Sequence, residues 1–269
     1  MHDTPHILLL GGTSETAPLA VKLATAGYQV LVSTATDADL AVGDHPAIRR
    51  RCGRLDRDQL AALIDRERMV AVIDATHPYA RDVHQAAREA AAHSQRPYLR
   101  YQRRALVEAS GDVVTARDHD EAARLACADG RPVLLTTGSR HLAPYVVAAQ
   151  HNGIELYARM LNHPEAVAAC EQAGLADTGR IFGRGPFSLE QNRALIRQHH
   201  IGVLVTKDSG RAGGVAEKLE AARLEQCRVI VVQRPDETTE NTFVDMNRLV
   251  TALQQCCPIP AVSKIGELM

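Results

Sequence analysis

The chain of 269 residues is predicted to form two Rossmann-like α/β domains, each on a parallel sheet, with a cleft between them. Short apolar runs alternate with segments that have apolar residues at helical spacing, as in βαβ units. The alternation stops once, from Arg103 to Val113, and then resumes, so we place a domain change there. The predicted domains are 1–104 and 105–257, followed by an irregular tail at 258–269.

Elements of the first domain follow from its apolar runs and from local start and stop signals. Helix 17–26 has Pro18 in its first turn and ends at Gly27, and Asp56 with Gln59 forms a capping box for the next helix. A third helix runs to about His93. Strands are expected at 6–10, 28–32, 48–51, 70–75 and 97–101.

The second domain repeats this rhythm without repeating the sequence. Pro164 and Gly174 mark the start and end of one helix, and Ser188 with Gln191 caps another. Helices are expected at 118–129, from about 141, at 164–173, 188–199, 214–226 and 243–255. Strands are expected at 133–136, 154–158, 180–183, 203–206 and 229–232.

Bulk properties exclude several classes of partner. The formal net charge is −1, which does not suggest a nucleic-acid or acidic-membrane binder. No apolar run is long enough to span a bilayer and the N-terminus lacks the form of a signal peptide, so a cytoplasmic location is expected. The six cysteines form no C-x-x-C pair or metal-ligand spacing, and no metal is expected. Nothing here decides between a monomer and a homo-oligomer.

The first strand runs into two glycines and then into a helix. Such a turn brings backbone N–H groups and the positive end of the helix dipole close to an anion, which suits a dinucleotide pyrophosphate. Only Gly11 matches the G-x-G-x-x-G pattern, because Thr13 and Thr16 replace the later glycines. A glycine-rich turn without a ligand is therefore the alternative.

The end of the second strand favours NADP over NAD. An NAD site has a carboxylate there for the ribose 2′-hydroxyl, whereas this chain has Ser33, Thr34 and Thr36 before Asp37. Hydroxyl groups accept a 2′-phosphate without repulsion. The alternative is that these are ordinary loop residues that bind no ligand.

Three later strand ends carry polar clusters, and each is either a capped helix start or a ligand site. They are Thr76–Tyr79, Thr137–Arg140 and the stretch from Lys207 to Gly214. The second offers hydroxyl groups and a guanidinium for a carboxylate or phosphate, and the third combines a charged pair with three glycines. The arginines at 49–51, 100, 103 and 104 are interpreted as solvated faces, with binding of a multiply charged acid as the alternative. No Tyr-x-x-x-Lys, Gly-x-Ser-x-Gly or Walker A motif occurs.

Taken in order, these strand ends resemble the precorrin-6A reductase family of cobalamin biosynthesis. The resemblance covers most of 6–235 and rests on Leu10–Glu15, Asp74–Ala80, Thr136–Ser139, Gly183–Phe187, Thr206–Gly210 and Gly213–Gly214. It implies NADPH as cofactor, a tetrapyrrole with acetate and propionate groups as substrate, and neither metal nor flavin. The implied reaction transfers a hydride to a ring carbon and adds a proton elsewhere.

The resemblance and the strand ends together give the expected site residues. Cofactor binding is expected from Gly11, Gly12, Thr13, Ser14, Glu15, Ser33, Thr34, Thr76, His77 and Pro78. Substrate binding is expected from Arg100, Thr137, Gly138, Ser139, Arg140, Lys207, Asp208, Ser209, Gly210, Gly213 and Gly214. The candidates for proton transfer are His77, Tyr79, Lys207 and Asp208, with water or the substrate as alternatives. Two other functions stay open: an NADP-dependent reductase or epimerase of another substrate, and a non-catalytic NADP(H) sensor.

Overall fold

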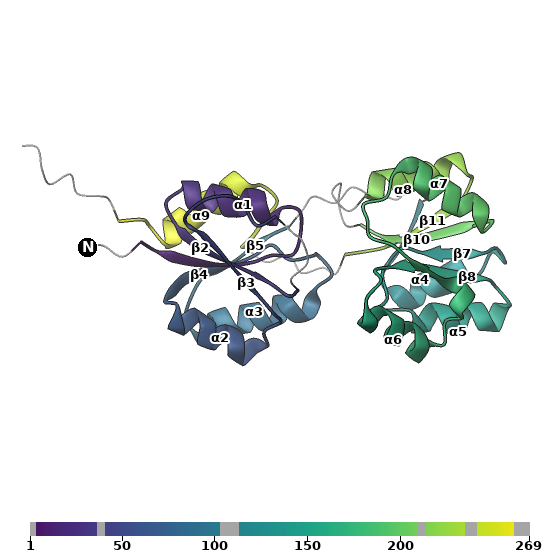
Figure 1. The fold of residues 1–269 in the computed structure, drawn as a ribbon, viewed down its shortest axis with the longest axis horizontal. Coiled ribbons are helices and arrows are strands. Elements are labelled where there is room, and N and C mark those ends of the chain that lie inside the picture. The colour runs from purple at the N-terminus through teal and green to yellow at the C-terminus, as the bar shows by residue number, and fades with distance from the viewer. Residues whose placement is uncertain (1–3, 37–40, 103–112, 209–213, 235–240, 261–269) are drawn as a thin grey trace, which may run out of the picture. The chain divides into compact units, whose positions relative to one another are not determined.

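The computed structural model describes residues 4–36, 41–102, 113–208, 214–234 and 241–260. The described chain divides into two compact units, one made of residues up to 102 together with those from 241 onward, and the other of residues 113–234 (Figure 1). Each unit is a parallel sheet covered by helices on both faces, which confirms the predicted fold class.

The sheet of the first unit has six strands in the order β12-β5-β4-β1-β2-β3. All of its strand pairs are parallel. Its strands are β1 (His6–Leu10), β2 (Gln29–Thr34), β3 (Ile48–Cys52), β4 (Met69–Asp74), β5 (Tyr98–Tyr101) and β12 (Thr242–Phe243). This is the strand order of the dinucleotide-binding doubly wound fold.

The sheet of the second unit also has six parallel strands, in the order β6-β11-β10-β7-β8-β9. They are β6 (Val113–Ala116), β7 (Val133–Leu135), β8 (Leu156–Met160), β9 (Arg180–Phe182), β10 (Val203–Lys207) and β11 (Arg228–Val232). From β7 to β11 the order matches that from β1 to β5, and β6 occupies the place of β12. The two units therefore share one topology.

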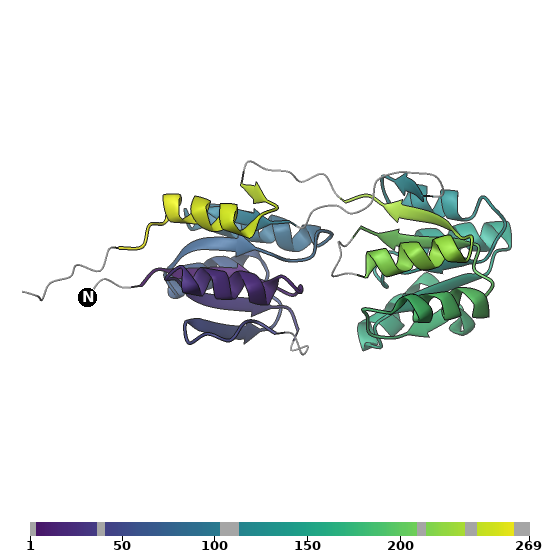
Figure 2. The same cartoon turned by 90° about the horizontal axis from the view of Figure 1, so that it is seen from above.

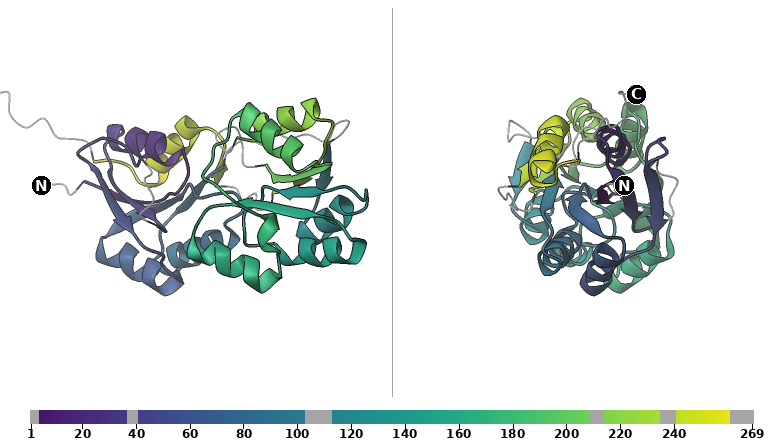
Figure 3. Two further views of the ribbon diagram at one scale, coloured as in Figure 1. Left: turned by 45° about the vertical axis from the view of Figure 1, so that its right-hand side comes forward. Right: turned by 90° about the vertical axis from the view of Figure 1, so that its left-hand side faces the viewer.

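Helices cover both faces of each sheet (Figures 1 and 2). In the first unit, α1 and α9 lie on one face and α2 and α3 on the other; in the second, α7 and α8 lie opposite α4, α5 and α6, and the 45° view in Figure 3 shows the same layers. The first unit has α1 (Thr16–Thr25), α2 (Arg57–Arg66), α3 (Arg81–His93) and α9 (Met246–Cys256). The second has α4 (His119–Ala126), α5 (Ala143–Asn152), α6 (Pro164–Ala173), the 3₁₀ turn η1 (Asp177–Gly179), α7 (Leu189–Gln198) and α8 (Val215–Leu224).

The central strand β1 shows how the sequence produces these layers. Successive side chains of a strand point to opposite faces, so Ile7 and Leu9 join the core beneath α1 and α9, while Leu8 and Leu10 join the core beneath α2 and α3. All four residues are at most 4% exposed. A strand buried on both faces has no polar alternation, which explains the continuous apolar run.

The C-terminal segment corrects the predicted domain boundary at 257. Strand β12 pairs with β5 of the first sheet, and α9 packs Leu249, Val250 and Leu253 into the first core. The Tyr28 hydroxyl donates a hydrogen bond to the Cys257 carbonyl oxygen (2.8 Å), and Ile259 of the expected irregular tail packs against the same core. The apolar stripe of α9 was visible in the sequence, but its partner sheet was not.

The strands β6 and β12 were not predicted, because they are short and half-buried and lack a clear alternation. Helix α4 ends at Ala126, before the predicted 129, with Cys127 as its C-cap. None of the described helices is both long and apolar enough to cross a membrane.

Candidate active site

The topology fixes where ligands are expected in each unit. In an open parallel sheet they bind at the carboxyl ends of the strands, where the chain order reverses direction across the sheet. That point lies between β1 and β4 in the first unit and between β7 and β10 in the second. The predicted clusters Gly11–Glu15, Thr76–Tyr79 and Thr137–Arg140, with Lys207 and Asp208, follow these four strands. Of the expected site residues, Ser209, Gly210 and Gly213 lie outside the described residues.

The loop after β1 is shaped by its two glycines and by Thr16. A Cβ on Gly11 would lie 2.5 Å from the Thr16 Cγ2, so only glycine fits there. Gly12 has φ +120°, which disfavours any side chain. The Thr16 hydroxyl oxygen accepts hydrogen bonds from the N–H groups of Gly12 and Thr13, both at 3.1 Å. Thr16 replaces the last glycine of the G-x-G-x-x-G pattern, and its hydroxyl holds the turn in place.

The same loop is tied to the loop after β4. The buried Thr13 hydroxyl donates a hydrogen bond to the Ala75 carbonyl oxygen at 3.0 Å. Ser14 is exposed, and its hydroxyl donates to the Glu15 carboxylate at 3.0 Å. The structure thus brings two of the predicted cofactor segments together at the reversal point of the first sheet.

Two arginines converge on the hydroxyl groups at the end of β2. The Arg51 guanidinium donates to the Ser33 Oγ at 2.7 Å, and the Arg50 guanidinium donates to the Thr34 Oγ1 at 3.2 and 3.3 Å. Both hydroxyl-bearing residues are buried, with 8% and 3% exposure. Hydroxyls and guanidinium groups at this place suit a ribose 2′-phosphate.

The sequence favours a solvated face for these arginines, and the structure instead directs Arg50 and Arg51 onto buried hydroxyl groups. The signal that would have found them is sheet register, because parallel β3 places Arg51 beside Ser33. The three consecutive arginines 49–51 do not all contact the end of β2. Arg49 is a surface residue that pairs with Glu67, and its side chain is 59% exposed.

The loop after β4 presents His77 to solvent and buries Pro78. The Tyr79 ring is tilted against the His77 ring, with centroids 5.6 Å apart. The Tyr79 N–H donates to the His77 Nδ1 at 3.4 Å. Both residues follow β4, so they lie at the carboxyl edge of the first sheet, and their cofactor or proton-transfer roles stay predictions.

Beneath this loop lies a buried polar network that sequence patterns did not predict. The Asp74 carboxylate is fully buried and accepts hydrogen bonds from the Thr76 hydroxyl (2.6 Å), the Tyr98 hydroxyl (2.7 Å) and the His84 Nδ1 (2.7 Å). The Arg100 guanidinium donates to the His84 Nε2 at 2.9 Å. Because a guanidinium can only donate, His84 must be neutral with its proton on Nδ1.

This network changes the role expected of Arg100. Its side chain is only 3% exposed, and besides His84 it contacts the Pro78 carbonyl oxygen at 3.5 Å. Arg100 therefore supports the loop after β4 from below and does not present its charge for substrate, which corrects the expectation. Burial alone raises the pKa of Asp74, but hydrogen bonds from His84, Thr76 and Tyr98 outweigh it and hold the pKa below its ordinary value.

In the second unit, the loop after β7 is joined to β10. The Thr136 N–H and hydroxyl both donate to the Val205 carbonyl oxygen, at 2.8 and 3.1 Å. Gly138 then has φ +83°, and Arg140 is exposed. The Thr137 Oγ1 is buried and has no hydrogen-bond partner within the described part of the chain.

Lys207 ends β10 in a cationic setting. Burial, followed by the charge of Arg140, lowers the pKa of Lys207 to about 8. His119 lies nearby, since the charge of Lys207 is one of the causes, after burial and His141, that lower the pKa of His119 to about 3. The His119 and His141 rings are stacked 4.2 Å apart. Lys207 is therefore protonated at neutral pH, yet it gives up its proton far more readily than an ordinary lysine.

Asp208 has a different environment from its neighbour. It is 4% exposed, and the Arg234 guanidinium contacts both its carboxylate (3.1 Å) and its carbonyl oxygen (2.8 Å). This pairing fixes the ends of β10 and β11 and occupies the carboxylate. Gly214 follows as the N-cap of α8 with φ +65°.

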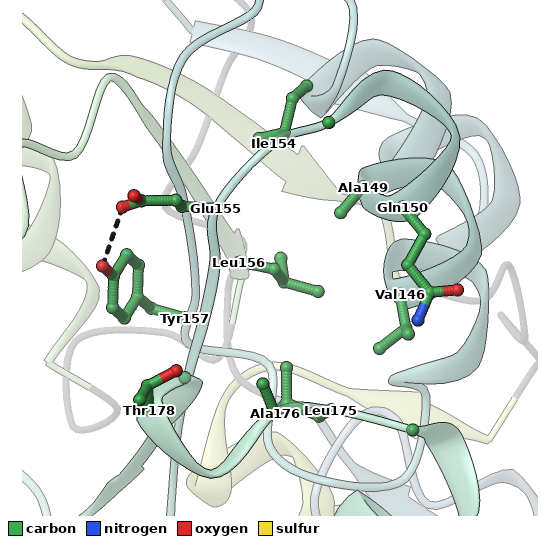
Figure 4. Close-up of a pocket in the computed structure, with 13 residues that line it drawn as sticks. Val146, Ala149, Gln150, Ile154, Glu155, Leu156, Tyr157, Leu175, Ala176 and Thr178 are labelled. Atoms are coloured by element: carbon green, nitrogen blue, oxygen red, sulfur yellow. Dashed lines mark hydrogen bonds between the residues drawn. The ribbon is translucent and has the colours of Figure 1, made fainter.

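A pocket of the second unit lies away from these loops. It has a volume of about 490 Å³ and is formed by the amino end of β8 and the segments that end α5 and α6. Figure 4 shows aliphatic side chains of Val146, Leu156 and Leu175 in its wall. Two of its polar residues, Glu155 and Tyr157, are joined by a 2.9 Å hydrogen bond. This edge of the sheet is opposite to the one where the predicted residues gather. Within the described residues, no group of three His, Cys, Asp or Glu side chains could hold a metal ion.

Comparison with known proteins points to one family. The model of the family described as precorrin-6x reductase CbiJ/CobK matches residues 6–254. A cobalt-precorrin-6A reductase of Priestia megaterium is 33% identical over 92% of this chain and 97% of that protein, and one of Salmonella typhimurium is 35% identical over 90% and 95%. A solved structure of CobK precorrin-6A reductase aligns with a TM-score of 0.74, 25% identity, and coverage of 96% of this chain and 99% of that one.

The matches run through both units, and they include both sheets and the loops described above. They agree with the ordered motifs that suggested the resemblance. The chain belongs to the precorrin-6x reductase family, oxidoreductases of cobalamin biosynthesis that act on a CH–CH bond.

Proposed function

We propose that this protein reduces the macrocycle of precorrin-6A, or of its cobalt-containing form, with NADPH as the hydride donor. The observation that carries the proposal is the family match along residues 6–254. In the reaction a carbon–carbon double bond of the ring system gains a hydride at one carbon and a proton at another atom. NADPH, when bound, supplies the hydride, and the protein supplies position, charge and the proton.

The first unit fits the cofactor. Gly12 leaves open space where a side chain would stand, because no atom of the described residues, apart from Gly12 and its two chain neighbours, lies within 4 Å of the place that a Cβ would take. We assign the pyrophosphate to the loop Gly11–Glu15 and the 2′-phosphate to Ser33, Thr34, Arg50 and Arg51. The short contacts of the two guanidinium groups with these hydroxyls support NADPH over NADH.

The second unit suits the substrate, which in this family carries acetate and propionate groups. Thr137, Ser139 and Arg140 follow β7, and Lys207 is the last residue of β10. Hydroxyls and cations at the ends of these strands bind carboxylates through charged hydrogen bonds. We assign these residues to the substrate and not to the cofactor.

We assign the proton to Lys207. A general acid works best when its pKa lies near the working pH, and the pKa of Lys207 is about 8. The alternative Asp208 is held by Arg234. After Lys207 Nζ has donated its proton to the ring, the neutral amine takes up a proton from water.

The test is a reductase assay with purified protein, NADPH, and precorrin-6A with and without cobalt. We expect loss of NADPH absorbance together with a change in the tetrapyrrole spectrum for one of the two forms. The cobalt form is included because the relatives carry both names. No oxidation of NADPH with either form, under conditions where a known precorrin-6A reductase works, contradicts the proposal.

The choice of cofactor has its own test in the run of three arginines. Arg51→Gln should raise the KM for NADPH by about tenfold or more and leave the KM for NADH nearly unchanged, because it removes a charged contact to the 2′-phosphate. Arg49→Gln is the matched control, since Arg49 pairs with Glu67 on the surface. Equal effects of the two substitutions on the KM for NADPH would refute the assignment.

A further inference from the structure

A small cavity at the carboxyl edge of the second sheet contains two cations that the sequence does not single out. Its volume is about 200 Å³. It is lined by the ends of β7, β8 and β9 and by α8, with Gly138, Arg159, Gly183, Phe187 and Lys218 among its residues. Gly138 belongs to the loop already expected to bind carboxylates, so the cavity adjoins the predicted substrate residues.

Arg159 is a buried cation held between neutral partners. Its side chain is 6% exposed, its Nη2 donates to the Asn192 Oδ1 at 2.8 Å, and its Cζ lies 3.9 Å from the centroid of the Phe187 ring. No carboxylate of the described residues lies within ion-pair distance of this guanidinium. Burial lowers the pKa of Arg159 to about 10. A buried charge of this kind destabilises the fold unless something compensates it.

Lys218 adds a second positive charge to the same cavity. Burial and then the charge of Arg159 lower the pKa of Lys218 to about 8, and the charge of Glu217 acts in the opposite direction. The two cations are thus close enough to repel each other. An anion in the cavity would relieve both the repulsion and the cost of burying Arg159.

The surrounding chain holds Arg159 in a fixed position. Asn192 is oriented by its own Nδ2, which donates to the carbonyl oxygens of Phe187 (3.2 Å) and Ser188 (2.8 Å). A Cβ on Gly183 would lie 2.9 Å from the Phe187 Cζ, so glycine is needed for the ring to stand where it does. Such a preorganised guanidinium is typical of a binding site and not of a solvated surface arginine.

We infer that this cavity is a carboxylate-binding subsite, in which Arg159 and Lys218 hold one carboxylate side chain of the tetrapyrrole substrate. The identity of the ligand rests on the proposed function, while the anion chemistry rests on the cavity itself. A carboxylate matches the planar guanidinium, and its small size matches the cavity.

The first test compares Arg159→Met with wild type in the reductase assay. We expect the KM for precorrin-6A to rise about 10- to 100-fold, and the KM for NADPH and kcat to change by less than about threefold. Lys218→Met should raise the same KM by a smaller factor. Arg180→Met is the matched control, because Arg180 lies in the same sheet at the start of β9, is largely buried and pairs with Asp177. A folded Arg159→Met protein with an unchanged KM for the tetrapyrrole overturns the inference.

A second test does not depend on turnover. Sodium propionate should raise the melting temperature of the wild type above its value in sodium chloride at equal ionic strength, and Arg159→Met should abolish the difference. If Arg159→Met does not fold, Lys218→Met serves in the same measurement. An equal response to propionate in wild type and variants overturns the inference. A wild type that responds through these residues but reduces neither form of precorrin-6A refutes the proposed function and supports the carboxylate site.

Discussion

The two units have the same strand order, yet they balance charge in opposite ways at the point where that order reverses. In the first, Asp74, neutral His84 and Arg100 form a buried network whose charges cancel beneath the loop after β4. In the second, Lys207 lies near Arg140, and Arg159 is buried between neutral partners. The described network of the first unit therefore pairs its charges internally, whereas the described contacts of Arg159 in the second unit are to neutral groups.

This difference agrees with the proposal that one topology serves two ligands. The fold decides that ligands bind at the carboxyl edge of each sheet, but the side chains decide which ligand. A self-balanced network gives the first unit a rigid base for the loops assigned to the cofactor. The buried guanidinium of Arg159 in the second suits the proposed substrate with several carboxylates, since an anion would compensate a buried charge. Substitutions in the two units should therefore affect different steps.

The largest effect is expected in the second unit, from Lys207→Met. If Lys207 donates the proton, kcat should fall about 100-fold or more, while NADPH binding stays close to that of wild type. The wild-type kcat should also decline above about pH 8, because the acid form of Lys207, whose pKa is about 8, is lost there. This limb of the pH profile should disappear in the variant. Steady-state kinetics over pH 6 to 10 measure both.

Lys22→Met is the control for Lys207→Met, because Lys22 belongs to α1 of the first unit and contacts Asn247. It should keep both kcat and the alkaline limb. An unchanged kcat in Lys207→Met would show that Lys207 is not the proton donor. Weakened NADPH binding as the main effect would contradict the assignment of the cofactor to the first unit and the substrate to the second.

The next effect is on stability and belongs to the first unit. Asp74→Asn should lower the free energy of unfolding by about 3 kcal/mol, because an amide group cannot accept all the hydrogen bonds that the carboxylate receives from Thr76, His84 and Tyr98. Urea unfolding followed by circular dichroism measures this. Asp65→Asn, at an exposed position near the end of α2, should stay within about 0.5 kcal/mol of wild type.

The pH dependence of this difference has a defined sign. The folded-state pKa of Asp74 is lowered, so its stabilisation is present above the unfolded pKa of about 4 and is lost as the pH falls below it. The gap between wild type and Asp74→Asn should therefore narrow in acid. A gap that is the same at pH 3 and pH 7 would show that the network does not hold Asp74 ionised.

The sequence was sufficient for those parts of this comparison that depend on local pattern. The apolar strand β1 and the capping boxes at Asp56 and Ser188 have the predicted structures, because each depends on neighbours along the chain. The positions of the polar loops after β1, β4, β7 and β10 also follow from alternation alone, and their binding of ligands stays a prediction.

The parts that depend on distant contacts were missed. Strand β12 pairs with Arg100 and Tyr101, which lie about 140 residues earlier in the chain. Hydrophobic periodicity does not predict a pairing between such distant segments. Arg100 reads as a surface cation until β4 and α3 bury it. Arg159 has the same kind of sequence context, and only the structure shows that its partners are neutral.

The smallest predicted effect separates the two units most directly. Gly12 and Gly138 occupy corresponding loops, after β1 and β7, with φ +120° and +83°. Apart from each glycine and its chain neighbours, no atom of the described residues lies within 4 Å of a Cβ at either position. Alanine would therefore introduce backbone strain of about 1–2 kcal/mol without a steric clash, and the loop would relax away from its ligand. We expect Gly12→Ala to raise the KM for NADPH, and Gly138→Ala the KM for the tetrapyrrole, each by about threefold to tenfold.

Gly130→Ala controls for strain alone, since Gly130 has φ +66° and equally open surroundings but precedes β7 at the opposite edge of the sheet. It should lower stability and leave both KM values unchanged. If Gly12→Ala and Gly138→Ala instead raise the same KM, one ligand contacts both loops. The assignment of one ligand to each unit would then fail even though the two sheets share their topology.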